Sequence, residues 1–393
     1  MASLFFNRDT KVYATDGVGI WEIPVLDGFS FSQATNANEV TLNEMTNASG
    51  VSRRSRQMFT DSFAPAEWSF STYIRPFKSA GTNVVGNANR NSATNHHMVD
   101  ECMWAWFTGK PTYTATAAGA SSAWSTGWTL GTSASTLSNA GSNRVDLKTF
   151  DLYFVLGAKD DTDPSGPTGP QYTDGNTLIY KLQGAVANEA SIDVDIDGIA
   201  TVQWSGFASI ISEQAAFDAR LAIIEGTADT DNFIRNRLTA LTATSSVSGS
   251  SKSYGLTLTG ANMTFSNNIS FLTPNTLGSV NQPIGHVTGT RSIQGSFNCY
   301  IDETSNGSAD MFADIIGATT TVTNSFDLDF FIGGETGSSD LTPPGMKVSF
   351  PTAHIELPVH SIEDVVSLET SFHALPSAIG TPDEFDLTIE GPA

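Results

Sequence analysis

The chain has 393 residues, which is enough for two or three domains that each bury a core. Hydrophobic residues make up 39% and charged residues only 15%, which excludes a disordered chain and a coiled coil. The net charge of −22 argues against a general nucleic-acid binder, because such proteins use basic residues to neutralise phosphates. The 24 phenylalanines, spread among many small polar residues, predict short aromatic strands joined by polar turns.

The two cysteines, Cys102 and Cys299, have no metal-binding or disulfide spacing. We expect both to be small buried side chains in a reducing compartment. The first residues lack the basic and apolar regions of a signal peptide, so none is predicted. No apolar run is long enough to span a membrane.

Four sequence blocks occur twice in the same order, which predicts an internal duplication. The repeats are Ser69–Ile74 with Ser296–Ile301, Met103–Gly109 with Met311–Gly317, Phe150–Gly157 with Phe326–Gly333, and Ala190–Val194 with Ala353–Leu357. We therefore expect a first unit over residues 1–210, a connecting segment over 211–252 and a second unit over 253–393.

Each repeated block predicts a local structure. In Phe326–Ile332, apolar residues alternate with Asp327 and Asp329, as in a strand with one buried face. The methionine-containing blocks predict short helices, with Asp100 and Ser308 as N-caps. Helices this short are stable only when docked on a sheet. The predicted fold is mainly β, with two tandem β-sandwich or half-barrel domains, each flanked by one short α-helix.

The copies differ in their insertions. The first unit alone carries two segments, Thr114–Asn143 and Lys159–Gly169, which we expect on the surface. In the connecting segment, Ser212–Glu225 has a helical pattern and Phe233–Leu241 alternates apolar residues, so an ordered, packed connection is predicted.

Several runs carry a family resemblance. They are Gly28–Gln33, Asn38–Met45, Ser52–Arg56 and Pro65–Phe77 in the first unit, and Asn267–Arg291 with Ser296–Ile301 in the second. These runs resemble tail tube proteins of tailed bacteriophages. The resemblance implies two orthogonally packed sheets with a flanking helix, and six such domains per ring, with a continuous β-barrel as the inner wall. It also implies that rings stack through a long loop and that an acidic lumen lets DNA slide.

The resemblance assigns two sets of candidate residues. The stacking loops map onto Glu44–Pro65 and Thr273–Arg291, with Arg53, Arg54, Arg56, Thr273, Pro274 and Arg291 as candidate contacts. We favour contact with the next ring over a solvated loop or a DNA grip for the arginine cluster. The candidate lumen-facing residues are Glu39, Thr41, Glu67, Ser69, Ser71, Gln294, Ser296 and Asn298.

The duplication adds a stoichiometry to this expectation. If each unit supplies one sixth of a ring, three chains form a homotrimeric, pseudo-hexameric ring. The expected partners are further copies of the chain and other tail proteins, such as the tape measure, the baseplate or tip, and the terminator. DNA would pass through without specific binding, in a virion tail assembled in the host cytoplasm. No membrane, cofactor, metal or catalytic residue is expected.

Alternative readings remain open at this point. Asp193–Gly198 begins like a calcium loop, but Trp204 stands where that loop needs a glutamate, and a strand with one polar face fits better. His96 and His97 could belong to a metal site, although a polar loop is the simpler reading. The main alternative function is a carbohydrate-binding β-sandwich of a virion or cell surface, which would use exposed aromatic residues. A glycosidase with paired carboxylates is a third possibility.

Overall fold

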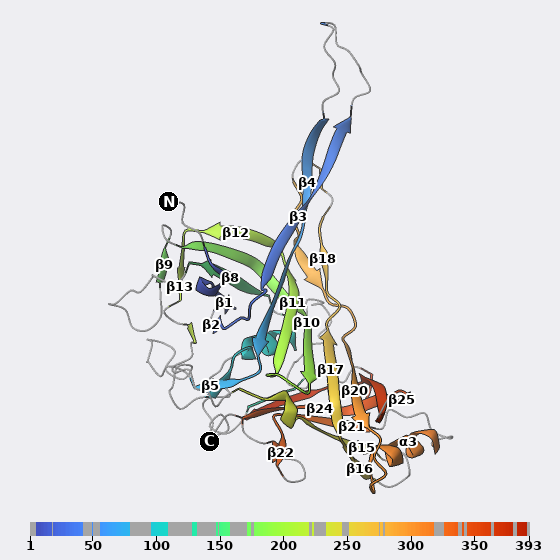
Figure 1. Ribbon diagram of the computed structural model, residues 1–393. Coiled ribbons are helices and arrows are strands. Elements are labelled where there is room, and N and C mark those ends of the chain that lie inside the picture. The colour runs from blue at the N-terminus through green and yellow to red at the C-terminus, as the bar shows by residue number, and fades with distance from the viewer. Residues whose placement is uncertain are drawn as a thin grey trace.

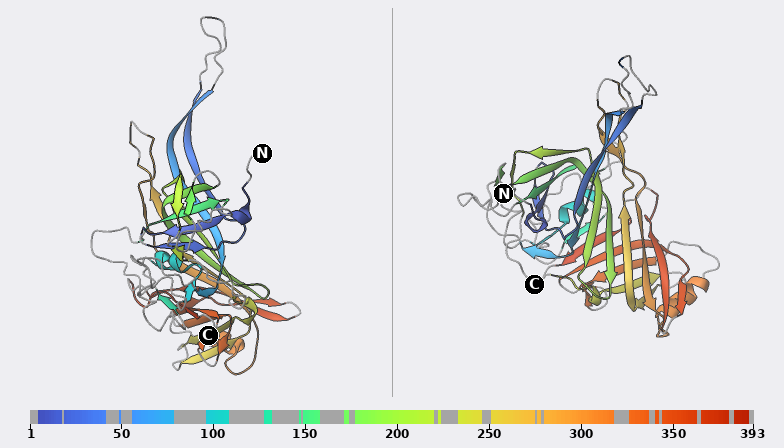
Figure 2. Two further views of the ribbon diagram at one scale, coloured as in Figure 1. Left: turned by 90° about the vertical axis from the view of Figure 1, so that its left-hand side faces the viewer. Right: turned by 45° about the horizontal axis from the view of Figure 1, so that its top comes forward.

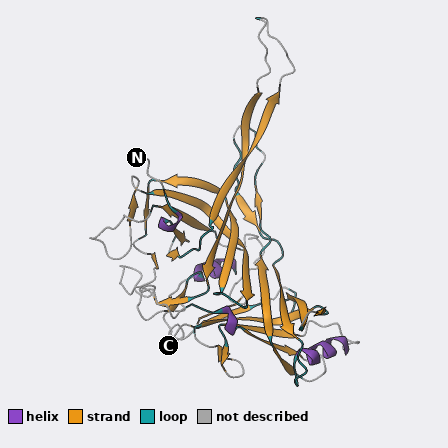
Figure 3. Ribbon diagram, viewed as in Figure 1, coloured by secondary structure: helices purple, strands orange, loops and turns teal. Residues whose placement is uncertain are grey.

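The computed structural model is built mainly from antiparallel β-strands, with short helices beside them (Figures 1 and 3). It describes residues 5–17, 19–41, 49, 56–78, 96–108, 128–131, 147, 149–157, 171–173, 177–219, 222–223, 233–245, 251–274, 276–277, 280–317, 326–336, 340–341, 344–362, 365–379 and 383–390. Within these residues, the helices are too short and too polar to cross a membrane.

The first half of the chain contains η1 (Asn7–Asp9), β1 (Lys11–Thr15), β2 (Ile20–Ile23), β3 (Ser30–Thr41), β4 (Arg56–Tyr73), β5 (Pro76–Lys78), β6 (His96–Met98), α1 (Glu101–Phe107), β7 (Trp128–Gly131), β8 (Phe150–Leu156), β9 (Gln171–Thr173), β10 (Leu178–Asp195), β11 (Thr201–Ala208), β12 (Ile210–Gln214), β13 (Ala216–Asp218) and β14 (Ala222–Ile223). The second half contains η6 (Asn236–Leu238), β15 (Ala240–Ser245), β16 (Lys252–Leu256), β17 (Leu258–Ser266), β18 (Ser270–Leu272), β19 (Gly285–Val287), β20 (Ser292–Tyr300), α3 (Ser308–Gly317), β21 (Phe326–Ile332), β22 (Glu335–Thr336), β23 (Asp340–Leu341), β24 (Gly345–Ile355), β25 (Val359–Ile362), β26 (Val366–Ala374) and β27 (Asp386–Glu390).

The main strands form three connected sheets. The first-unit sheet has the order β14-β2-β1-β8-β10-β12. The shared sheet runs β3-β4-β11-β10-β17-β20-β26 and ends at β25 and the last residues of β24. The second-unit sheet has the order β16-β15-β21-β24-β27-β7. The shared sheet thus takes strands from both halves of the chain, joined where β10 pairs with β17.

The pairing pattern repeats between the two halves, as a duplication requires. The hairpin β1–β2 and its neighbour β8 correspond to β15–β16 and β21. The strands β3, β4, β11, β10 and β12 correspond to β17, β20, β26, β24 and β27. The mainly-β prediction with one short helix beside each unit is confirmed. Strand β15 belongs to this repeated pattern although it lies in the segment expected only to connect the units.

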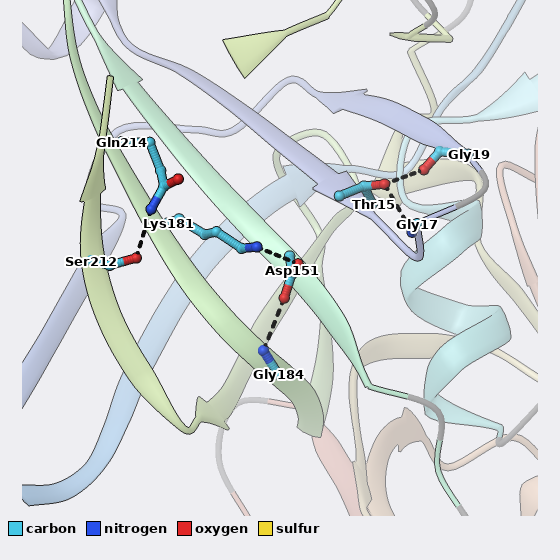
Figure 4. A network of polar contacts seen from close by, with 8 residues as sticks. All are labelled: Thr15, Gly17, Gly19, Asp151, Lys181, Gly184, Ser212 and Gln214. Carbon is cyan, nitrogen blue, oxygen red and sulfur yellow. Dashed lines mark hydrogen bonds and ion pairs between the residues drawn. The ribbon is translucent and has the colours of Figure 1, made fainter. Parts of the chain in front are cut away.

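Strand β10 belongs to two sheets because it bends at Gly184 (Figure 4). Its pairing with β8 shifts between Leu182 and Ala185, and Gly184 has a φ of +64°, which favours glycine. The Asp151 carboxylate accepts a hydrogen bond from the Gly184 backbone N–H at 3.0 Å and contacts the Lys181 ammonium at 2.8 Å. These contacts fix the bend from which β10 crosses into the shared sheet.

One hydrophobic core lies between the shared sheet and the other two sheets. Helix α1 is its centre, and all of its residues are buried. The Trp106 ring stacks on Phe150 at 4.4 Å between centroids, whereas Trp104 meets Trp204 edge-on at 4.9 Å. Trp104 also contacts Phe265 of β17. The helix of the first unit therefore packs against both halves of the chain, and each aromatic pair adds about 0.5–1.5 kcal/mol to the burial.

Two local predictions are wrong. Residues Ser212–Glu225, expected to be helical, include β12, β13 and β14, because pairing with β10 and other strands outweighs the local periodicity. The match of Ala190 with Ala353 is also wrong. The residue opposite Phe150 is Ala185, and the residue opposite the repeat partner Phe326 is Ala353, so Ala185 is the true counterpart.

Candidate functional site: sheet face, edges and arms

The face of the shared sheet that points away from the core is polar. One rung of directly opposite residues crosses most of the sheet and consists of Ser71, Gln203, Ser191, Thr264, Gln294 and His373. Opposite residues lie on the same side of a sheet, so these side chains share one surface. The neighbouring positions Trp68, Phe70 and Trp204 point into the core and are buried. Six candidate lumen residues lie together on this polar face: Glu67, Ser69, Ser71, Gln294, Ser296 and Asn298.

Carboxylates are the main charges on this polar face. They belong to Glu67, Glu189, Asp193, Asp195, Glu356 and Glu369. Below the arms, the described residues of this face include no lysine or arginine. The amide of Asn262 donates a hydrogen bond to Asp193, and His373 lies 3.5 Å from Glu356. The face is therefore acidic, with histidines as its only basic groups in the described strands.

Several residues of this face, on β11 and β26, were not among the candidates predicted from the sequence. They include Gln203, Ser205, Glu369 and Ser371. Their signal was present, because polar residues alternate with buried ones along both strands. Asp193, considered for calcium, is part of the same face, and its side chain bonds Asn262.

The shared sheet ends in two unpaired edges among the described residues. At one end, β3 pairs only with β4. At the other end, β25 pairs only with β26, and apolar side chains flank this edge. Leu357 is 62% exposed and Val359 is 67% exposed. An unpaired strand edge with exposed apolar residues favours pairing with another chain.

Two arms extend from the same end of the shared sheet (Figures 1 and 2). The longer arm is the hairpin formed by β3 with β4 from Arg56 to Ser62, and it projects well beyond the body. The shorter arm is β18, β19 and the segment between them. The two arms touch, because the Phe63 N–H donates to the Asn281 oxygen at 2.9 Å and the Asn281 N–H donates to Asp61 O at 3.0 Å.

The candidate stacking residues divide into three groups. Thr273 and Pro274 lie on the shorter arm, as expected. Arg56 lies on the longer arm, 3.4 Å from Glu39 of the same arm, whereas Arg53 and Arg54 lie outside the described residues. Arg56 is therefore already partly neutralised within its own chain.

Arg291 is placed differently from the expectation. Its side chain is only 8% exposed, with Nη1 3.7 Å from Glu384 and Nε donating to Asn267 Oδ1 at 3.2 Å. Burial lowers the pKa of the guanidinium. Asn267 in turn donates to the Phe107 carbonyl at 3.0 Å. Arg291 therefore links the base of the shorter arm to α1 and is not available to a neighbouring ring.

Two candidate lumen residues are separated from the other six. Glu39 lies on the longer arm, exposed and paired with Arg56. Thr41 is the last residue of β3 on the same arm. Sequence alternation gave them the same pattern as the wall residues, but they lie opposite Met58 and Arg56 in the part of the β3–β4 hairpin that projects beyond the body.

A pair of buried carboxyl groups begins α1. The Asp100 side chain does not cap the helix as predicted; it accepts hydrogen bonds from Trp204 Nε1 at 2.9 Å and Thr72 Oγ1 at 3.4 Å. Burial raises the pKa of Asp100 to about 7. Glu101 accepts from Trp21 Nε1 at 3.1 Å. Both groups hold core elements together, and neither opens onto a described pocket.

The tryptophans that the structure describes do not form an exposed platform. Every tryptophan whose side chain the structure describes is at most 2% exposed. The alternative of a carbohydrate-binding surface therefore has no support among the described tryptophans.

Comparison with known proteins agrees with the resemblance seen in the sequence. No family model matches the chain. Tail tube protein pb6 of Escherichia phage T5 is 28% identical over 393 residues, which cover 97% of this chain and 75% of that protein. The similarity thus extends over both units and both arms. It supports the predicted family: along nearly its whole length the chain is similar to a bacteriophage tail tube protein, a structural component of the virion.

Proposed function

We propose that three chains close into a ring whose inner wall is the shared sheet, and that stacked rings form the conduit for the phage genome. The observation that carries this proposal is the pairing of β10 with β17 inside one chain. That pairing joins the first unit to the second, and the same contact between the second unit and the first unit of the next chain would close the ring. The two units are residues 11–214 and 240–390, so β15 belongs to the second.

The duplication gives the register of the contact between chains. Within the chain, Asp193 lies opposite Asn262. Asn262 lies opposite Ser296, the repeat partner of Ser69, and Ser69 lies opposite Ser30. Ser30 is therefore the counterpart of Asn262.

The other side of the contact follows in the same way. Asp193 lies opposite Thr201, which lies opposite Tyr73. Ser361 lies opposite Ser367, which lies opposite Tyr300, the repeat partner of Tyr73. Ser361 is therefore the counterpart of Asp193, and it should lie opposite Ser30 of the next chain.

Burial supports this contact. Ala190 on β10, directly opposite Phe265 of β17, is fully buried, whereas Leu357 and Val359, at the open edge of the second unit, are 62% and 67% exposed. A neighbouring β3 would cover Leu357 and pair both open edges, which removes a site of uncontrolled aggregation.

The acidic face suits a conduit for DNA. Carboxylates repel phosphates, and the described residues of this face below the arms include no lysine or arginine to hold the duplex. The ends of such a tube would contact the other tail proteins, including the tape measure, the tip or baseplate and the terminator.

Cysteine cross-linking tests the ring directly. Directly opposite residues in antiparallel strands have Cα atoms about 4.5–5.5 Å apart, within the range that a disulfide needs. We expect the double variant Ser30→Cys, Ser361→Cys to form disulfide-linked species of up to three chains. Cys102 and Cys299 are buried, so they should not interfere. A pairing of Ser30→Cys with Ser253→Cys on β16 is the control. Species of six chains, or no cross-link in assembled tubes, would contradict the proposal.

A further inference from the structure

Strand β10 ends and β17 begins at the end of the shared sheet opposite the arms (Figure 1). A pocket of about 210 Å³ lies there, and its walls include Val194, Ile196, Leu258 and Tyr300 together with the charged residues Asp195 and Arg237. We call it the rim pocket. Ile196 is 45% exposed and Tyr300 40% exposed, so apolar surface is open there.

The rim pocket has a fixed shape because the connecting segment closes one side. The Ala200 N–H donates to Ile234 O at 2.9 Å, and the Asn236 N–H donates to Gly198 O at 3.2 Å. These bonds hold η6 against the turn between β10 and β11. The connecting segment occurs once per chain, so the pocket is built once per chain and not once per unit.

The tip of the shorter arm carries apolar side chains that its own chain does not cover. Leu277 is fully exposed, and Ile284 is 72% exposed. The tip is nevertheless held in place: the Thr276 hydroxyl donates to Asn281 Oδ1 at 2.5 Å, and the Asn281 amide donates back to the Thr276 carbonyl at 3.2 Å. Asn281 also bonds the longer arm. From Thr273 to Ile284 the sequence has no charged residue.

We propose that Leu277 of the shorter arm docks in the rim pocket of a chain in the next ring. The inference rests on the proposed function, because stacking identical rings brings the arm end of one against the opposite end of the next. The uncharged apolar tip then meets the exposed Ile196 and Tyr300 of the pocket, and burying these side chains removes exposed apolar surface. The partner is a second copy of this chain.

A charge-reversal experiment tests the contact on both sides. Leu277→Lys would replace an apolar side chain with a hydrated ammonium group in a pocket that Arg237 and Asp195 both line, so we expect three-chain rings to form normally while tube growth falls at least tenfold. The double variant Leu277→Lys, Arg237→Glu should recover tube growth, because the pocket would then carry two carboxylates and no guanidinium to meet the ammonium group. Gln282→Lys, on the same arm and exposed, is the matched control and should assemble like the original protein.

The readouts separate this inference from the proposed function. Mass photometry counts chains per ring, and light scattering with negative-stain microscopy follows tube growth. Normal tube growth in Leu277→Lys, or no recovery in the double variant, overturns the docking site while leaving the ring intact. Loss of rings in Leu277→Lys also overturns it, because the tip would then act within a ring. Absence of rings in the original protein overturns the proposed function itself.

Discussion

Trp68 on β4 lies directly opposite Gly206 on β11, and its indole fills the space that a side chain at Gly206 would take. The second unit has the reverse arrangement at the same rung, where Gly295 on β20 lies opposite Phe372 on β26. The two copies thus keep one large and one absent side chain per rung but exchange the strands that carry them. The two side chains at this rung therefore fill a similar space in both copies, although the residue types at both positions differ.

This relationship predicts the effect of adding a methyl group. In Gly206→Ala, the new Cβ would clash with the Val186 backbone carbonyl oxygen and would lie 2.5 Å from Cζ2 of Trp68, so both the backbone and the indole must move. Overpacking of this kind costs about 1–3 kcal/mol in the free energy of unfolding. Denaturant unfolding of the protein should show the loss, whereas Gly255→Ala, where a Cβ meets nothing within 4 Å, should change little. Equal stability of the two variants would contradict this packing.

Asp100 predicts a pH dependence of stability. Its pKa rises from 3.8 in the unfolded chain to about 7 in the folded protein, because the carboxyl group is buried. Between these values the folded protein keeps a proton that the unfolded chain loses, so the free energy of unfolding falls as pH rises from about 4 to about 7. The contribution is at most about 4 kcal/mol.

Unfolding curves at several pH values check this prediction. Asp100→Asn should remove most of the decline, because an amide does not titrate. Asp302→Asn is the control with the opposite pH dependence. Hydrogen bonds from the Thr304 backbone N–H and hydroxyl lower the pKa of Asp302, so its contribution to the free energy of unfolding is lost as pH falls. Parallel curves for Asp100→Asn and the original protein would contradict the assignment.

The arginine cluster that ends at Arg56, the first residue of β4, predicts an assembly defect. Replacing Arg53, Arg54 and Arg56 with serine should slow tube growth while leaving rings intact, because the arm would lose its attraction to acidic groups of the next ring. Each exposed pair contributes only about 0.2–1 kcal/mol, so the effect depends on repetition around the ring. Arg8→Ser, at an exposed arginine near η1, is the control. Unchanged polymerisation measured by light scattering would exclude the role.

The acidic wall predicts weak contact with DNA. Gln294→Lys together with Asn298→Lys should leave tubes able to form but make them retain duplex DNA, because ammonium groups would then face the phosphates. The retained fraction should fall as salt concentration rises, and Ser253→Lys on β16 should not produce it. Retention by the control to the same degree would show that the polar face is not the wall.

The repeated strands could be predicted because they carry their signal locally. Phe150–Leu156 and Phe326–Ile332 alternate buried and exposed side chains, and both are strands in corresponding places. The helix starts at Glu101 and Ser308 were also close to the expected positions. Polar alternation placed six of the eight wall candidates on one face.

The remaining features depend on contacts between distant residues, which no local pattern contains. Because the strand pairing shifts at the Gly184 bend, the residue that corresponds to Ala353 is Ala185 and not Ala190. The buried contacts of Arg291 with Asn267 and Glu384 join parts of the chain that a loop assignment treats as separate. The rim pocket likewise forms only when the connecting segment packs on the turn after β10.

If one duplicated chain takes the place of two subunits, the assembled tube should have threefold symmetry. Cryo-electron microscopy of tubes grown from the purified protein would give the number of chains per ring. We expect three chains per ring, with β3 of each chain paired to β25 of its neighbour. Six full chains per ring, or rings in which these edges remain unpaired, would contradict it.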